Sequence, residues 1–113
     1  MNLRGAPAEN LAAAFLERRG LKILARNYRC RFGEIDLVAS SGAGLVFVEV
    51  RARESGAYGG AAGSITAAKR RRIVAAARHY LAKHRVRSAC RFDVVLIQGR
   101  DREIEWLTDA FGE

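Results

Sequence analysis

Two strongly apolar runs, residues 32–39 and 45–53, follow one another in the chain and are separated by a short turn rich in Ser and Gly. This pattern predicts a β-hairpin. Each run nevertheless carries acidic residues, with Asp36 in the first and Glu49 in the second. Carboxylates are costly to bury unless they are paired or bind a metal ion. We therefore expect the hairpin to bring Asp36 and Glu49 together at a functional site, beside a cation.

The rest of the chain alternates between helical and strand patterns. Pro7 suits the first position of a helix and Gly20 suits its C-terminal end. The run 45–53 is the most apolar, which predicts a central strand. The other expected elements are a helix over 7–19, a strand over 21–28, a long helix that begins at Ser64 or Thr66 and runs to about His84, strands over 91–98 and 103–107, and a final helical turn over 108–111 that packs Phe111 on the core. This order predicts one domain over residues 1–113, with a sheet of α/β or α+β type and helices packed against it.

The balance of charge favours a polyanionic partner. The chain has 20 Lys and Arg residues against 12 Asp and Glu, which gives a formal charge of +8 and a pI near 10.5. Such a surplus indicates nucleic acid first and a membrane surface second. A small basic group around Tyr28 suits either a phosphate backbone or a solvated edge strand. The largest group, from Lys69 to Phe92, has nine cations and no acid: residues 69, 70, 71, 72, 78, 83, 85, 87 and 91.

The apolar stretches are too short for a membrane protein. None approaches the roughly 20 residues that a transmembrane helix needs, and Glu9 and Glu17 interrupt the apolar stretch nearest the start. We therefore expect a cytoplasmic protein. In that compartment Cys30 and Cys90 are expected to be free thiols, because disulfides are rare there.

Several positions need an interpretation of their own. The glycine-rich segment 54–64 is either a substrate flap or a simple crossover connection, and it lacks the Gly-Lys-Ser/Thr of a nucleotide P-loop. Glu9, taken alone, is interpreted as a solvated partner of the helix dipole. Asp93 lies inside an apolar strand, where an ion pair with a neighbouring Arg explains it most simply. His79 and His84 are five residues apart and are expected to be surface residues on different faces of the long helix.

Six segments combine into a pattern that covers nearly the whole chain. They are Asn-Tyr-Arg at 27–29, Gly-Glu-Ile-Asp-Leu at 33–37, Val-Phe-Val-Glu-Val-Arg-Ala-Arg at 46–53, Lys69, Arg-Phe-Asp-Val-Val at 91–95 and Asp-Ala-Phe at 109–111. Over roughly residues 5–111 this pattern resembles the YraN family of small uncharacterised bacterial proteins. That family is similar to the PD-(D/E)xK nucleases, which include archaeal Holliday-junction resolvases and the catalytic domain of tRNA-splicing endonucleases.

The resemblance implies a restriction-endonuclease-like α/β core, with a mixed central sheet of about five strands flanked by helices. It implies catalytic roles for Asp36 and Glu49 as the two acids of the motif, with Arg51 where the motif has lysine. Glu9 matches the first-helix Glu that often adds a metal contact in resolvase-like nucleases. The implied metal ligands are therefore Glu9, Asp36 and Glu49, and such oxygen ligands suit Mg²⁺ or Mn²⁺.

Arg51 is a departure from the motif. Arg has a pKa above about 12 and cannot act as a base, although it can bind a phosphate oxygen in a bidentate manner. Arg53 and Lys69 are therefore candidates to replace the missing ammonium group. The residues expected to contact nucleic acid are Arg29, Arg31, Arg53, Lys69, Arg70 and Arg71.

The leading hypothesis is a Mg²⁺- or Mn²⁺-dependent endonuclease that binds DNA, in preference to RNA, and hydrolyses its phosphodiester bonds. Branched and single-stranded DNA are the candidate substrates. The alternative is a nucleic-acid-binding module that has the same fold and no catalytic activity. A third hypothesis is an interaction protein whose basic helix docks on an acidic partner. A homodimer is left open, because many junction-cutting nucleases of this fold act as dimers.

Overall fold

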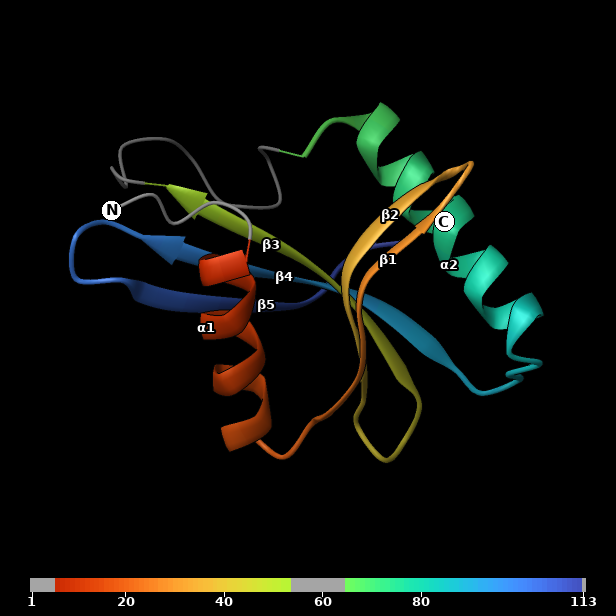
Figure 1. The fold of residues 1–113 in the computed structure, drawn as a ribbon, viewed down its shortest axis with the longest axis horizontal. Helices are drawn as coiled ribbons and strands as arrows, with labels where there is room; N and C mark the ends of the chain where they lie inside the picture. Colours follow the sequence, from red (N-terminus) through yellow and green to blue (C-terminus); the bar gives the residue numbers. More distant parts are fainter. Residues whose placement is uncertain (1–5, 54–64, 113) are drawn as a thin grey trace.

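The computed structural model describes residues 6–53 and 65–112, which form two helices and five strands (Figure 1). The elements are α1 (Ala6–Arg18), β1 (Lys22–Cys30), β2 (Gly33–Ser40), β3 (Leu45–Arg53), α2 (Ala67–Lys83), β4 (Cys90–Gln98) and β5 (Glu103–Phe111). The segment 54–64, with its two interpretations as a flap or a crossover, lies outside the described residues.

All five strands belong to one mixed sheet, in the order β1-β2-β3-β4-β5. β3 and β4 run parallel, with α2 between them in the chain, and the other neighbours run antiparallel. β3 therefore occupies the centre of the sheet, as its apolar content predicted. The expected α/β fold with a mixed sheet of about five strands is confirmed.

The two helices pack on opposite faces of the sheet. Along β3, Val46 and Val48 belong to the core layer under α1, whereas Leu45 and Phe47 belong to the layer under α2. Successive strand residues point to opposite faces, so this alternation separates the two layers. Glu49 has the same facing as Leu45 and Phe47 and therefore lies on the side of α2.

The helix ends follow the local signals in the sequence. Thr66 caps α2, because its hydroxyl accepts a hydrogen bond from the backbone N–H of Lys69 at 3.1 Å. Ser64, the other expected cap, lies outside the described residues. Gly20 follows α1 with a φ of 92°, a conformation that suits glycine. Within the described part of the chain, neither helix is long and apolar enough to cross a membrane.

The helical turn predicted for residues 108–111 is wrong, because β5 continues to Phe111. The carboxylate of Asp93 accepts a hydrogen bond from the backbone N–H of Asp109 at 2.9 Å, which holds this segment on β4. Asp109 has a φ of 51° and the β4–β5 register shifts beside it, so the strand bulges and then resumes. The expected packing of Phe111 is confirmed, since its ring stacks on Phe92 with 5.2 Å between the centroids.

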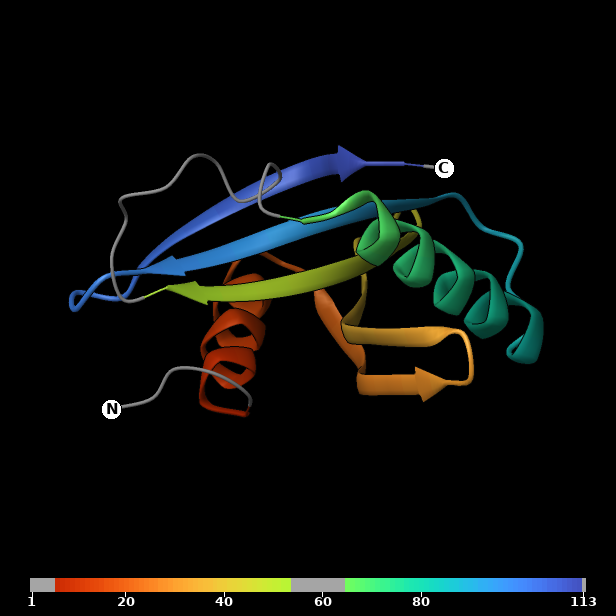
Figure 2. The same cartoon turned by 90° about the horizontal axis from the view of Figure 1, so that it is seen from above.

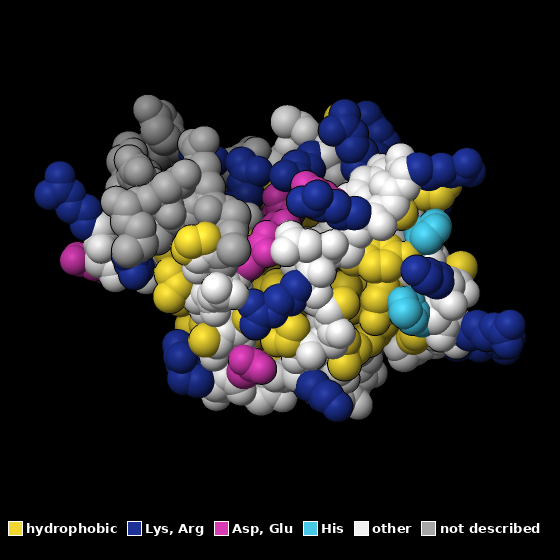
Figure 3. Space-filling model, in the orientation of Figure 1, with side chains coloured by type: hydrophobic (Ala, Val, Ile, Leu, Met, Phe, Trp, Pro, Cys, Tyr) yellow, Lys and Arg dark blue, Asp and Glu magenta, His cyan; other side chains and the backbone are white. Residues whose placement is uncertain are grey.

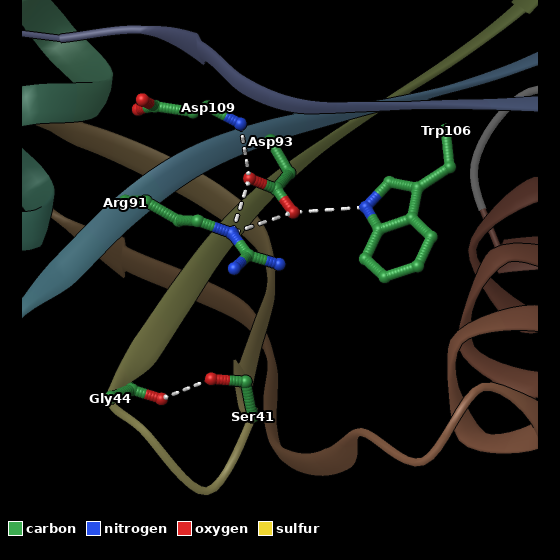
Figure 4. A network of polar contacts seen from close by, with 6 residues as sticks. All are labelled: Ser41, Gly44, Arg91, Asp93, Trp106 and Asp109. Carbon is green, nitrogen blue, oxygen red and sulfur yellow. Dashed lines mark hydrogen bonds and ion pairs between the residues drawn. The ribbon is translucent and has the colours of Figure 1, made fainter.

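Asp93 is fully buried and anchors a polar network between β4 and β5 (Figure 4). Besides the Asp109 N–H, Arg91 Nε donates to its Oδ1 at 3.0 Å and the Trp106 indole N–H donates to its Oδ2 at 2.9 Å. The predicted ion pair with a neighbouring Arg is therefore confirmed. A buried carboxylate with these donors is compensated in charge and hydrogen bonding, so we assign it a structural role.

Candidate functional site

The candidate site lies where two neighbouring strands separate. β2 and β3 pair as far as Leu37 and Val48, and β1 and β2 then bend away from the other three strands (Figures 1 and 2). Asp36 and Glu49 are the next residues on the two strands. Asp36 Oδ2 accepts a hydrogen bond from the backbone N–H of Val50 at 2.8 Å, so the carboxylate takes the place of a strand partner. The separation of β2 from β3 thus positions both acids through backbone geometry.

Asp36 and Glu49 are two acids in a poorly solvated place. Glu49 is only 4% exposed, and Asp36 is partly buried. Burial, followed by the charge of Glu49, raises the pKa of Asp36 to about 8. Hydrogen bonding to the Glu49 carboxyl group raises this pKa further, whereas the hydrogen bond from the Val50 N–H lowers it. At neutral pH the pair therefore retains a proton. A cation between the two groups would relieve the same repulsion.

This raised pKa predicts an unusual dependence of stability on pH. The pKa of Asp36 rises from 3.8 to about 8 on folding, so between these values the folded protein binds a proton that the unfolded chain has released. The contribution of Asp36 to the free energy of unfolding is therefore fully present below about pH 4 and is lost as the pH rises towards 8. We expect the melting temperature of the wild type in EDTA, relative to that of Asp36→Asn, to fall between pH 5 and pH 9. Parallel melting profiles for the two proteins would contradict this assignment.

Two cations complete the site on the side of α2. Lys69 Nζ lies 2.8 Å from Glu49 Oε2, and an Arg51 guanidinium nitrogen lies 3.7 Å from the same oxygen. We refer to Asp36, Glu49, Arg51 and Lys69 as the carboxylate fork. On the face drawn in Figure 3, acidic side chains gather in a central patch with Lys and Arg side chains beside it. Of the two candidates to replace the motif lysine, Lys69 is the one that contacts Glu49, and Arg53 lies two residues beyond Arg51 on the same strand.

Glu9 approaches the fork from α1 without joining it. Its Oε1 accepts a hydrogen bond from the side-chain amide of Asn27 at 2.8 Å, and its charge makes the smallest of the contributions that raise the pKa of Asp36. Over residues 6–53 and 65–112, no three Asp, Glu, His or Cys side chains are grouped closely enough to hold one metal ion. The predicted set of Glu9, Asp36 and Glu49 is thus not gathered as a three-ligand site. Sequence reasoning missed Asn27 as the partner of Glu9, although Asn27 opens one of the matching segments.

The donor set still fits a divalent cation. Mg²⁺ is commonly bound through one or two carboxylates, with the remaining positions taken by water and by phosphate oxygens of a substrate. Asp36 and Glu49 supply two such carboxylates, and their mutual repulsion is the electrostatic condition that a cation relieves. The fork therefore has suitable ligands for Mg²⁺ or Mn²⁺.

The other predicted nucleic-acid contacts are spread over β1, the β1–β2 turn, β3 and α2. Arg29 forms an exposed ion pair with Glu34 at 3.0 Å. The Arg31 guanidinium lies over the ring of Phe32 at 4.8 Å. Arg70 Nε donates to the backbone carbonyl of Ile65 at 3.1 Å, and Arg71 is exposed on α2. Of this group, Lys69 contacts Glu49, whereas Arg29 and Arg31 lie near the tip of the β1–β2 hairpin.

Comparisons with known proteins cover nearly the whole chain. The profile of the uncharacterised protein family UPF0102 matches residues 8–97. A UPF0102 protein of Nitrosomonas europaea is 57% identical over 111 residues, which cover 97% of this chain and 94% of that protein. A UPF0102 protein of Methylobacillus flagellatus is 53% identical over 112 residues, with 98% of each chain covered. A third, from Ralstonia nicotianae, is 55% identical over 113 residues, with 96% of this chain and 85% of that protein covered.

Proposed function

The chain belongs to the uncharacterised protein family UPF0102, or YraN family, which has a restriction-endonuclease-like fold, and from this we propose that it is a metal-dependent endonuclease acting on DNA. One observation carries the proposal. Two acids from adjacent strands, Asp36 and Glu49, meet at a fork beside an ammonium group, and added positive charge would keep both of them ionised at neutral pH. A surplus of 20 Lys and Arg over 12 acids supports a polyanionic substrate.

Each residue of the carboxylate fork has a role in this proposal. Asp36 and Glu49 bind the cation, and a Mg²⁺ or Mn²⁺ ion held there supplies activation of water and neutralisation of phosphoryl charge. Arg51 and Lys69 stabilise the negative charge that develops on the phosphoryl oxygens. The oxygen of water bonds to phosphorus and the water gives up one proton to the surrounding solvent. The phosphorus–oxygen bond of the backbone breaks, and the leaving oxygen acquires a proton, so that one water molecule is consumed. Lys69, which is closer to Glu49 than Arg51 is, takes the place of the motif lysine.

The proposal is tested by incubating the purified protein with end-labelled linear duplex, single-stranded, flap and four-way DNA, and with RNA of the same sequences. Parallel reactions contain Mg²⁺, Mn²⁺ or EDTA. We expect cleavage of at least one DNA substrate in the presence of either metal ion and none in EDTA. Equal cleavage in EDTA would contradict a metal-dependent mechanism. Cleavage of RNA alone would show that RNA, and not DNA, is the substrate.

The second candidate function is nucleic-acid binding without catalysis. Arg51 favours it, because an Arg cannot take over the proton chemistry that a lysine in that position can perform. This alternative requires affinity for DNA in EDTA that falls steeply with salt, since counterions are released from each neutralised phosphate. Tight binding in EDTA without cleavage of any substrate in Mg²⁺ or Mn²⁺ would favour this second function.

A further inference from the structure

A group of aromatic side chains lies on the surface where the β1–β2 hairpin meets α2. The ring of Phe32 is 44% exposed at the tip of this hairpin. Its centroid lies 6.0 Å from that of His79, and the His79 ring lies 5.9 Å from that of Tyr28. We call Tyr28, Phe32 and His79 the aromatic platform.

The sequence prediction for the two histidines is confirmed in part. Both were expected to be surface residues on different faces of the helix. His84 is exposed, whereas His79 is partly buried and shares a hydrogen bond with the Tyr28 hydroxyl through Nδ1. His84 also turns towards Tyr28, with 6.5 Å between the ring centroids, and it packs on Tyr80 at 4.3 Å. The helix therefore directs both imidazoles towards the same side of the hairpin.

The platform is held rigidly from below. Tyr28 contacts the buried Tyr80 edge-on at 5.1 Å, and its hydroxyl is fixed by His79. Burial raises the pKa of the Tyr28 hydroxyl, so the phenol keeps its proton. A surface whose rings are already ordered loses little conformational entropy when it binds a flat ligand.

Cations are interleaved with these rings. The Arg31 guanidinium lies over the Phe32 ring at 4.8 Å, and Lys83 Nζ lies over the Tyr28 ring at 6.0 Å. An exposed aromatic ring next to positive charge is the arrangement that unpaired nucleic acid requires, because bases stack on the rings while the cations attract the phosphates. A duplex offers no unstacked base to such a surface.

A cavity lies between the β1–β2 hairpin and α2, next to the platform on one side and Lys69 of the carboxylate fork on the other. It has a volume of about 350 Å³ and is lined by Arg29, Cys30, Gly33, Glu34, Lys69, Arg72 and Ile73. We call it the basic cavity, because its lining has three cations and one acid, Glu34, which is paired with Arg29. Lys69 also contacts Glu49, and Gly33 directly follows Phe32 in the chain. A Cβ on Gly33 would lie 2.7 Å from the Arg72 carbonyl oxygen, so glycine is what allows the hairpin tip to approach α2 this closely.

We propose that the aromatic platform stacks unpaired bases of a single-stranded nucleic acid, whose phosphates cross the basic cavity towards the carboxylate fork. This inference rests on the proposed function for what happens to the strand at the fork. How the strand is held depends on the platform and the basic cavity, and does not require catalysis at the fork. The protein therefore selects single strands, or the unpaired arm of a branched substrate, over continuous duplex.

The experiment measures the affinity of the full chain for a fluorescein-labelled 15-residue oligo(dT) and for a duplex of mixed sequence and the same length, by fluorescence anisotropy in EDTA. We expect Phe32→Ala to weaken binding of the single strand about tenfold, the scale of one lost base–aromatic stack. Phe32→Trp should bind as well as the wild type, and the affinity of Phe32→Ala for the duplex should change less than about twofold. Thermal melting checks that the variants fold.

Leu24→Ala is the matched control, because Leu24 on the same hairpin is 42% exposed and carries no ring. Its affinity for the single strand should remain that of the wild type. The inference is overturned if Phe32→Ala binds the single strand like the wild type, if it loses duplex binding equally, or if Leu24→Ala loses as much.

The two proposals fail in different ways. If Phe32→Ala binds normally while the wild type cleaves DNA only with metal ions, the platform is wrong and the nuclease proposal stands. If Phe32→Ala loses single-strand affinity but no substrate is cleaved, the platform stands and the nuclease proposal falls. If the wild type binds no nucleic acid, both are wrong.

Discussion

Replacing Glu49 by Gln is expected to lower the rate of DNA cleavage at least about a hundredfold, the scale on which removal of one electrostatic contact to a transition state acts. Gln preserves the shape of the side chain but removes its negative charge. The fork then keeps one carboxylate for a cation, and Lys69 and Arg51 lose the negative charge that they both approach. The rate is measured with excess enzyme over labelled DNA, so that binding does not limit it.

A comparison with Glu105→Gln separates the local effect from a general loss of negative charge. Glu105 is exposed on β5, where it pairs with Leu96 of β4, and it therefore lies two strands away from Glu49 on β3. Its variant should cleave at the rate of the wild type. Both variants should melt close to the wild type, which excludes misfolding. Undiminished cleavage by Glu49→Gln would remove the carboxylate fork from the mechanism and would point to a contaminating nuclease.

The meeting of Asp36 and Glu49 could be predicted because its cause is local. The residues lie on two strands joined by a short turn, and the turn length sets the register from Ser40–Leu45 to Leu37–Val48. One further step along each strand reaches the two acids. Period-two alternation also places Glu49 and Arg51 on one face of the strand, which agrees with their ion pair.

The contact of Lys69 with Glu49 could only be offered as one of two candidates. It depends on how α2 crosses the sheet after the segment 54–64, and the sequence between the two residues contains no signal for that geometry. The partial burial of His79 and the approach of both histidine rings to Tyr28 were missed for the same reason. A helical spacing of five residues describes α2 alone, whereas Tyr28 approaches from a separate hairpin and makes contact with both rings.

The end of the chain shows tertiary structure overriding a local pattern. Thr108 and Asp109 are typical of a helix start, which led to the predicted turn. In the fold, the backbone N–H of Asp109 instead donates to Asp93, a residue of the neighbouring strand. A local hydrogen-bonding preference worth about 1 kcal/mol cannot compete with a donor required by a buried carboxylate. The sequence did show that Asp93 lies within an apolar strand. It did not show which residue of the neighbouring strand would be its partner.

Replacing Asp93 by Ala is therefore expected to be the most destabilising single change outside the fork. The side chain is 0% exposed, and its removal would leave the Arg91 guanidinium, the Trp106 indole N–H and the Asp109 N–H without their acceptor. Each of the two donors left unsatisfied, the Trp106 indole N–H and the Asp109 N–H, costs about 1–3 kcal/mol, and Arg91, whose side chain is 36% exposed, loses its partner at a smaller cost. For a domain of this size the combined loss corresponds to a fall in melting temperature on the order of 10–20 °C. Urea unfolding measures the change in free energy directly.

Two further variants identify the source of this loss. Asp101→Ala removes an exposed acid from the β4–β5 turn, so it should leave the free energy of unfolding within about 0.5 kcal/mol of the wild type. Asp93→Asn retains one carbonyl oxygen as an acceptor but no charge, so its loss should lie between those of the other two variants. A change of less than about 1 kcal/mol in Asp93→Ala would show that water replaces the carboxylate. The bulge at Asp109 would then owe its position to the pairing of β5 with β4 rather than to Asp93.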